Sequence, residues 1–233
     1  DMRVEIATNP EAAKANRARF LKNDTRIELD NQLRARLATY RGDDDLRPSV
    51  STMFITDSLG TIVSIALDMP VSDENLSTGY NFAFRTYFHG GRDDFNRDVP
   101  RESVVPLDRP HLSAAFQSTA TGLWKIAFSM PIYLNGNADE AAPAENRNPD
   151  GVFVITTNLG DFESMSDSQL SDQLAVVIEA RDGPLRGTVL QHPLMDQETD
   201  VSRPLAGKRF RIPDTMLDDL LNSDDVNYID PMS

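Results

Sequence analysis

The chain has 233 residues, and its 37 Asp and Glu residues outnumber its 23 Lys and Arg residues, giving a formal net charge of −14. A field of this sign repels nucleic acids and anionic lipids, and no basic patch stands apart from it, so the chain is not a general polyanion binder. The absence of Cys excludes disulfides, thiolate zinc sites and thiol nucleophiles. No apolar run approaches the roughly 18 residues of a membrane span.

The two ends of the chain, Asp1 and Ser233, do not have the character of natural termini, and no signal peptide precedes the first. We therefore expect a piece of a longer protein, with any targeting or membrane-spanning segments outside it. A processed mature protein that starts at Asp1 is the alternative.

A long helix is predicted over residues 10–41. Asn9 and Pro10 form a helix start signal, and neither Gly nor Pro then occurs before Gly42. The apolar residues form two stripes on opposite sides, one of Ala13, Phe20 and Ile27 and the other of Leu29, Leu33, Leu37 and Tyr40. We expect one stripe to pack on the chain's own domain and the other on a second copy, in a parallel homodimer. The alternative is a surface helix that packs only within its own chain.

The remaining pattern predicts an α+β protein with one antiparallel sheet and helices on one face. A strand–turn–strand signal covers Met53–Ala66, and residues 67–110 have no regular period apart from short helical pieces. Further strands are expected at residues 123–133, 152–157, 174–180 and 187–190. The domain organisation we expect is a helix at 1–45, a core at 46–200 and a C-terminal segment at 201–233. That segment contains a strand-like stretch (203–213) and a short helix (216–221), or begins a truncated second module.

Catalytic motifs are absent from the sequence. It has no nucleophile elbow, zinc-protease motif, phosphate loop or dinucleotide fingerprint. The histidines His89, His111 and His192 are far apart in the sequence, and no two have the spacing of metal ligands on a helix. Acidic clusters such as Asp93-Asp94 are interpreted as solvated loops. We therefore predict no enzymatic activity, no metal site and no cofactor. A hydrolase on an unusual scaffold is the weakest hypothesis, because no nucleophile–base pair can be named.

Two segments stand out as a candidate binding site. Arg85 lies among five aromatic residues between positions 80 and 88, and the only Trp, Trp124, adjoins Lys125 in a predicted strand. A guanidinium in an aromatic wall can hold a carboxylate through two hydrogen bonds, and an inward Lys would add a second cation. The alternative is an aromatic core with both cations paired to surface acids. Residues 75–91 contain no Asp or Glu, which favours an external anion; the alternative partner of Arg85 is Asp93, Asp94 or a more distant acid that folds back.

In order and spacing, these segments resemble the extracytoplasmic Cache sensor domains of bacterial transmembrane receptors. The features that carry the resemblance are the long N-terminal helix, the strand pair with Asp57 and Gly60, the stretch Phe84-Arg85-Thr86-Tyr87-Phe88, the strand from Trp124 to Pro131-Ile132, and the strand that opens Gly151-Val152. The resemblance covers roughly residues 10–190. It is strongest to sensor regions attached to serine/threonine kinases and to sensor histidine kinases for dicarboxylates.

The resemblance implies a PAS-like sheet whose concave face holds a small molecule. Arg85 matches the carboxylate-binding Arg of the family, Tyr87 a pocket aromatic, and Trp124 and Lys125 the pocket strand; we expect Phe88 to line the same pocket. Amino-acid binders of the family usually carry an Asp near the end of the strand that begins at Gly151, and this chain does not. A carboxylic acid or another small anion is therefore favoured over an amino acid.

The leading hypothesis is a ligand-sensing input domain, extracytoplasmic, without catalysis, in a membrane-anchored receptor that is a protein kinase. The runner-up is a structural or dimerisation module whose sheet is filled by side chains. A pocket between the sheet and the Arg85 segment would favour the first, and a pocket filled by Phe82, Phe84 and Trp124 the second.

Overall fold

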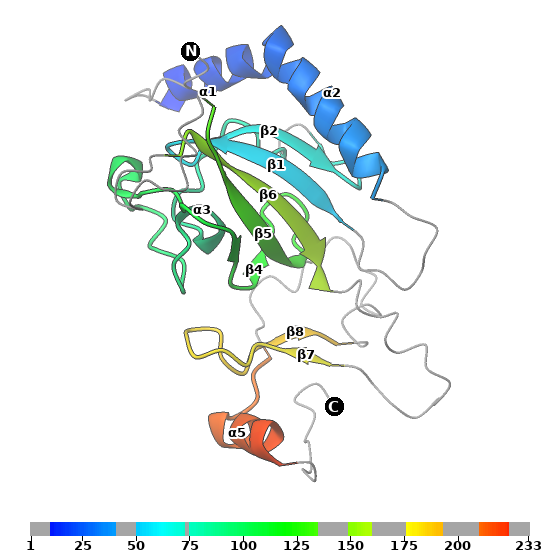
Figure 1. Ribbon diagram of the computed structural model, residues 1–233, viewed down its shortest axis with the longest axis vertical. Helices are drawn as coiled ribbons and strands as arrows, with labels where there is room; N and C mark the ends of the chain where they lie inside the picture. Colours follow the sequence, from blue (N-terminus) through cyan, green and yellow to red (C-terminus); the bar gives the residue numbers. More distant parts are fainter. Residues whose placement is uncertain are drawn as a thin grey trace.

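In the described part of the chain, two N-terminal helices lie beside a main antiparallel sheet, and a smaller C-terminal unit follows it (Figure 1). The computed structural model describes residues 10–40, 50–72, 75–134, 149–159, 176–192 and 210–223, except for the side chains of residues 10–13. The α+β class with a PAS-like antiparallel sheet, predicted from the sequence, is confirmed.

The N-terminal helical region consists of α1 (Pro10–Leu21) and α2 (Asp24–Ala38), so the prediction of one continuous helix over residues 10–41 is wrong. Asn23 separates them with an extended backbone (φ −72°, ψ 124°), and its side chain accepts the N–H of Arg26 at 3.0 Å. An Asn side chain that satisfies a free N–H of the first turn starts a new helix without any Gly or Pro. Figure 1 shows the change of direction between the helices. No helix in the described segments is long and apolar enough to cross a bilayer.

Helix α2 packs on the sheet through one of the two predicted stripes. Leu33 and Leu37 are buried against Met53 and Ala66. Ile27, from the other stripe, stays 39% exposed. Only the middle of one stripe, Leu33 and Leu37, is therefore buried within the chain, since Tyr40 is 47% exposed. The homodimer through the N-terminal helices stays a prediction.

A buried ion pair fixes α2 to the sheet. Arg26 Nη1 donates to Asp30 Oδ2 at 2.5 Å, and the other oxygen of Asp30 accepts the hydroxyl of Ser64 at 2.5 Å. Arg26 and Asp30 are 5% and 7% exposed. Arg26 Nη2 also donates to the carbonyl of Leu21, at the end of α1. One charged pair thus joins α1, α2 and the sheet.

The main sheet has the strand order β2-β1-β6-β5-β3, with β4 also paired to β5, and all pairs are antiparallel. The strands are β1 (Thr52–Asp57), β2 (Ile62–Leu67), β3 (His111–Leu112), β4 (Phe116–Gln117), β5 (Trp124–Ile132) and β6 (Gly151–Asn158). The four longer ones confirm the strands expected there. Between β1 and β2, Asp57 Oδ1 accepts the N–H groups of Leu59 and Thr61, and Gly60 takes φ 81°. This geometry explains the Asp-x-x-Gly spacing.

The chain between β2 and β5 covers the concave face of the sheet. As expected, it is irregular with short helical pieces, α3 (Thr86–His89) and the 3₁₀ turn η1 (Arg101–Ser103). Its aromatic side chains form the main core with inward residues of the strands; the largest are Phe54, Phe82, Phe84, Tyr87, Phe88 and Phe116. This layer and the sheet enclose the candidate site.

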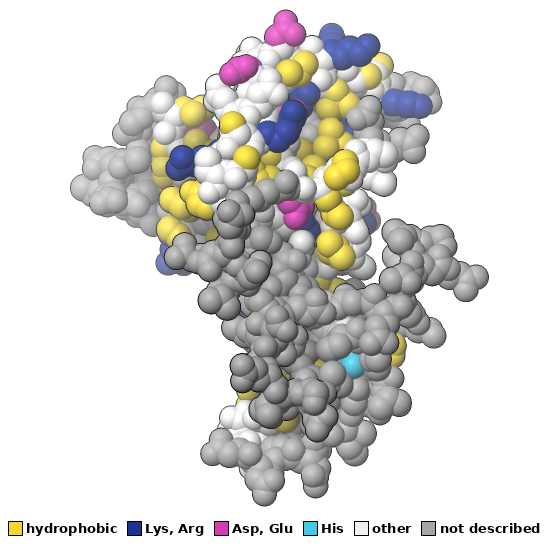
Figure 2. All heavy atoms as spheres, turned by 90° about the vertical axis from the view of Figure 1, so that its right-hand side faces the viewer, with side chains coloured by type: hydrophobic (Ala, Val, Ile, Leu, Met, Phe, Trp, Pro, Cys, Tyr) yellow, Lys and Arg dark blue, Asp and Glu magenta, His cyan; other side chains and the backbone are white. Residues whose placement is uncertain are grey.

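The opposite face of the sheet is only partly covered. Helix α2 contacts β2 and β1, whereas Leu112, Phe128 and Met130, on β3 and β5, are each about half exposed (50%, 53% and 54%). On the face that Figure 2 presents, hydrophobic side chains gather in a band next to Lys and Arg side chains.

A C-terminal unit follows the main sheet. The strands β7 (Val177–Ile178) and β8 (Val189–Gln191) pair with each other in a separate sheet, so the expectation of a single sheet is wrong here. The short helix predicted near the C-terminus is α5 (Asp214–Asn222). Backbone bonds from Val189 N to Phe210 O and from Ile212 N to Gly187 O join residues 210–212 to β8. These bonds cross the predicted domain boundary at residue 200. Most of the strand-like stretch expected at 203–213 lies outside the described residues.

Candidate ligand-binding site

A small cavity, called here the inner cavity, lies between the concave face of the sheet and the covering layer. Its volume is about 40 Å³, and since one water needs roughly 10–15 Å³ on this measure, it has room for about three waters. The sheet contributes Thr52, Phe54, Ile62, Ile65, Leu67, Phe116, Gln117, Lys125 and Thr156; the covering layer contributes Ser77, Phe82, Arg85, Tyr87, Ser118, Thr119 and Ala120. The cavity therefore combines an apolar lining with two cationic groups.

Arg85 is buried at the edge of the inner cavity, with 8% of its surface exposed. Its Nη1 donates to Asp94 Oδ2 at 2.7 Å, its Nη2 donates to the carbonyl of Gln117 at 3.2 Å, and its guanidinium lies over the rings of Phe84 and Phe116. The chain folds back and brings Asp94, nine residues later, to Arg85, which is the alternative that the sequence analysis left open beside an external anion.

Asp94 is held by both carboxylate oxygens. Besides Arg85, it accepts the backbone N–H of Thr86, in the first turn of α3, at 2.9 Å. The side chain of Asp94 is 30% exposed, whereas that of Arg85 is 10% exposed. Asp94 thus approaches the guanidinium from the solvent side.

Lys125 enters the inner cavity from the sheet. It is 2% exposed, and its Nζ donates to Ser51 Oγ at 3.1 Å and to Thr52 Oγ1 at 2.9 Å. Along β5, buried residues alternate with more exposed ones, so Lys125 faces inward and Trp124 faces the other side. Arg85 and Lys125, the two cations predicted for one site, line the same cavity.

The three predicted aromatic residues are in different places. Tyr87 lines the inner cavity, with its ring 5.3 Å from those of Phe54 and Phe116. Burial raises the pKa of Tyr87 well above its usual range, with Asp94 adding to the increase and Arg85 opposing it, so the phenol stays neutral. Phe88 is fully buried in the core and is not among the residues lining this cavity.

Trp124 lines a larger space, called here the outer cleft. This cleft has a volume of about 400 Å³; its other lining residues are Arg85, Asp93, Asp94, Arg97, Ala114, Ala115, Phe116, Gln117, Ser118, Thr119, Pro184 and Leu185. Five of them, Arg85 and residues 116–119, also line the inner cavity. Arg85 and the 116–119 segment therefore form the wall between the two spaces.

Sequence reasoning missed the polar segment 117–119 as a member of the site, and it named Asp94 only as an alternative partner of Arg85. Asp94 belongs to an acidic pair that the sequence analysis treated as solvated, and only the fold shows that it faces Arg85. Ser77 Oγ and Thr119 Oγ1, 3.5 Å apart, lie on the two sides of the cavity's covering layer. No group of three or more His, Asp or Glu side chains suited to a metal occurs in the described part of the chain.

Acid is expected to destabilise the fold near this site through His89. Its Nδ1 accepts the N–H of Gly91 at 3.0 Å, its Nε2 faces the carbonyl of Phe84, and its ring stacks on Phe95. Burial lowers the pKa of His89, with the neighbouring His111 in the same direction, against the Phe84 carbonyl and Asp94. Because the folded pKa is below the unfolded one, the unfolded chain binds the proton more readily.

The stabilisation from neutral His89 is therefore complete above pH of about 6.5 and is lost as the pH falls below it. We expect the urea midpoint to fall between pH 7.5 and 5.5, and to fall less in His89→Gln, whose amide can both accept and donate. Burial and the charge of Arg181 also lower the pKa of His111, so some slope remains. An unchanged slope in His89→Gln would contradict the assignment.

No family model matches the chain, and no curated protein matches it. Among solved structures, it is similar to the ligand-binding domain of the Pseudomonas aeruginosa PAO1 amino acid chemoreceptor PctC in complex with GABA. The TM-score is 0.36 and the sequence identity 18%, over 75% of this chain and 70% of that chain. The strand order of the sheet, rather than this likeness, defines the fold of the protein.

Proposed function

We propose that this protein is an extracytoplasmic ligand-sensing input domain, without catalytic activity, of a transmembrane receptor. It binds a small organic acid or another small anion in the inner cavity and passes the occupied state to an output domain, which is a serine/threonine or histidine protein kinase. The observation behind the proposal is that two buried cations, Arg85 and Lys125, come from opposite layers to line one small cavity.

The physical support comes from the cost of burying charge. Each cation loses hydration on burial and needs compensating partners. Hydroxyl groups of Ser51 and Thr52 solvate the ammonium of Lys125, and the rings of Phe84 and Phe116 flank Arg85. An anion placed between two such cations gains more from each than it would in water, because the surrounding aromatic side chains exclude solvent.

The ligand has to open the inner cavity, because a volume of about 40 Å³ is smaller than a dicarboxylate. The covering layer contains the polar segment 117–119, which borders the outer cleft, and Asp94, which competes for Arg85. A ligand that binds an opened form shifts the population towards it. Opening driven by the ligand is the kind of change that a sensor requires.

The alternative, a structural or dimerisation module, is favoured by one observation. The guanidinium of Arg85 donates to Asp94 and to the carbonyl of Gln117, so groups of the protein itself compensate its charge. In that case α1 and α2 would only hold two subunits together, through the stripe that leaves Ile27 39% exposed.

A thermal-shift screen of the chain against small carboxylic acids and amino acids tests the proposal. A cognate acid at 100 times its Kd stabilises by about 2.7 kcal/mol. We expect Arg85→Ala and Lys125→Met to abolish this shift. Arg109→Ala, at a side chain that is 88% exposed, is the matched control and should keep it.

A cavity-filling variant separates the two candidate functions. Ser77 is 7% exposed and lines the inner cavity. In a sensor, Ser77→Leu should abolish the ligand-induced shift with both cations intact. In a structural module, Ser77→Leu should keep or raise the melting temperature. No acid in the screen should then raise the melting temperature of the unsubstituted chain, and that result would refute the sensing of such acids.

A further inference from the structure

The segment 91–95, called here the coupling segment, contacts both the ligand-binding site and the C-terminal unit. We propose that the ligand anion and Asp94 compete for Arg85, and that displacing Asp94 moves the coupling segment and loosens the hold of Arg92 on the β7–β8 unit. This inference rests on the proposed function, since it takes Arg85 as the anchor of the ligand.

At the ligand-binding site, Asp94 occupies the position of an anion. Its carboxylate binds the guanidinium of Arg85 and the backbone N–H of Thr86, two donors that a carboxylate ligand would also use. The neighbouring Phe95 N donates to Phe84 O at 2.8 Å. An incoming anion that takes Arg85 therefore removes one of the bonds that keep the coupling segment against residues 84–86.

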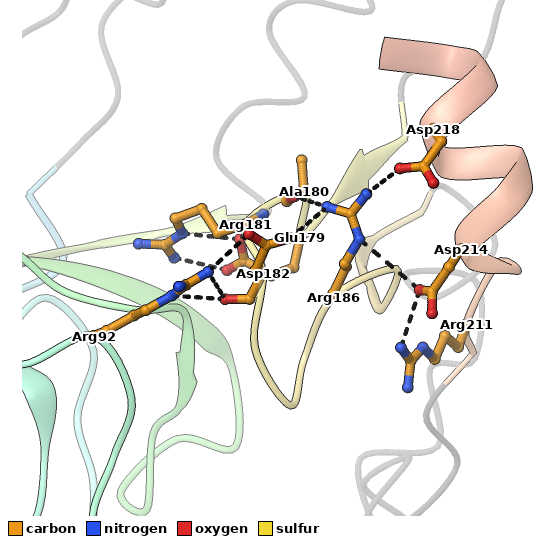
Figure 3. Close-up of polar contacts among 9 residues, drawn as sticks. All are labelled: Arg92, Glu179, Ala180, Arg181, Asp182, Arg186, Arg211, Asp214 and Asp218. Atoms are coloured by element: carbon orange, nitrogen blue, oxygen red, sulfur yellow. Dashed lines mark hydrogen bonds and ion pairs between the residues drawn. The ribbon is translucent and has the colours of Figure 1, made fainter. Parts of the chain in front are cut away.

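Two residues earlier, the coupling segment binds the C-terminal unit. Arg92 Nε and Nη2 both donate to the carbonyl of Asp182, at 3.0 and 2.7 Å, and Nη2 lies 3.2 Å from its carboxylate (Figure 3). The carboxylate of Asp93 lies against the turn, since a Cβ built on Gly183 would be 2.7 Å from Asp93 Oδ1. A shift of residues 92–93 therefore cannot leave the turn at 182–183 unchanged.

From Asp182 the contacts continue to the last helix. Arg186 lies 3.4 Å from Asp182 and binds Asp218 on α5, and its Nη1 donates to the carbonyl of Ala180 at 2.6 Å (Figure 3). Asp214, at the start of α5, is 4.0 Å from Arg186. Arg186 thus joins the turn at 182–183 to α5. A change at the contact between Arg92 and Asp182 is therefore passed on to α5 as well.

The C-terminal unit is also attached directly to the main sheet. Leu190 and Val177 pack with Ala115, Leu159 and Trp124 in one apolar cluster. Arg181 donates to the carbonyl of Ser113 at 3.0 Å and pairs with Glu179. Ser113 donates its N–H to Ala127 on β5 and therefore stays with the sheet. Since these contacts hold β7 and β8 on the sheet, loss of the Arg92 contact loosens the turn at 182–183 while the two strands stay in place.

The effect of ligand binding on the C-terminal unit is limited by the strength of the contact between Arg92 and Asp182 that transmits it. Arg92 and Asp182 have side chains that are 62% and 78% exposed, and exposed ion pairs contribute at most about a fivefold bias. Ligand binding is therefore expected to change the opening equilibrium of the turn at 182–183 by no more than about fivefold. That is the lower end of allosteric coupling.

Amide hydrogen exchange on the full chain tests the inference without any ligand. The reporters are three N–H groups of the turn, those of Arg186, Gly187 and Thr188, which bond within residues 179–188. Asp94→Ala removes the carboxylate that the ligand would displace, and we expect their exchange to rise by up to about fivefold. Amides of β1, far from the coupling segment in the sheet, serve as the internal reference.

Two further variants sharpen the result. Asp98→Ala removes the same charge nearby, from a side chain that has no hydrogen bond or ion pair with the described residues, and should leave the reporters unchanged. In an Arg92→Ala background, Asp94→Ala should have no further effect on them. If Asp94→Ala also accelerates the exchange of the β1 amides, the comparison is made with Asp94→Asn instead. That variant keeps an acceptor for the N–H of Thr86.

Unchanged reporters in Asp94→Ala and Asp94→Asn would overturn the inference, as would an effect that persists in full without Arg92. Because no ligand is added, this outcome is independent of the thermal-shift screen. A positive exchange result with no stabilising acid would refute the proposed function alone.

Discussion

Asp30→Ala is expected to lower the free energy of unfolding by about 3–5 kcal/mol, the loss found when one partner of a buried ion pair is removed. The substitution leaves the guanidinium of Arg26 buried without its carboxylate, and the Nε of that group already has no hydrogen-bond partner among the described residues. It also removes the acceptor of Ser64 on β2. Urea denaturation followed by circular dichroism measures the change.

A paired substitution shows whether the charge itself is responsible. Replacing Arg26 by Met together with Asp30 by Leu removes both charges, and such replacements are often neutral or stabilising. We expect the double variant to be much more stable than Asp30→Ala. Equal losses in both would mean that the contact with Ser64, and not the unpaired cation, accounts for the effect.

Gly151→Ala is expected to cost about 4 kcal/mol or more, because the sheet has no room for a side chain there. A Cβ at Gly151 would lie 2.1 Å from the carbonyl oxygen of Thr56, on the neighbouring strand. That oxygen belongs to the backbone, so the β1–β6 pair would have to separate locally. The midpoint of thermal or urea unfolding measures the cost.

Gly122→Ala is the matched control for this prediction. Gly122 has φ 74°, and a Cβ there would meet nothing within 4 Å. Its substitution therefore costs only the backbone strain of a left-handed residue, about 1–2 kcal/mol. A loss at Gly151 no larger than this would show that β1 and β6 can move apart easily.

The strands of the main sheet could be predicted because their signals are local. Alternation along β5 and β6 and the turn between Asp57 and Gly60 need only neighbouring residues. The same alternation would have placed Lys125 and Trp124 on opposite faces, although the sequence analysis assigned both to one pocket. The break at Asn23 was also local, but it lies in a stretch without Gly or Pro, where we expected the helix to continue.

The partner of Arg85 could not be predicted from the residues near it. Asp94 reaches the guanidinium because Phe95 pairs with Phe84 through the backbone, and no periodic pattern in the 68–110 region announces this return of the chain. The separate sheet of β7 and β8 was missed for a similar reason. Period-two patterns predict strands, but not which strands become neighbours.

The central position of β1 between β2 and β6 determines when this sheet can form during synthesis. The hydrogen bond between Val152 N and Thr56 Oγ1 spans 96 residues, so a long loop must close before β1 gains its second neighbour. The β1–β2 hairpin can form early, but the sheet that lines the inner cavity is incomplete until β6 has left the ribosome. Folding is therefore a late event governed by non-local pairing, and slower than in proteins whose strands pair in chain order.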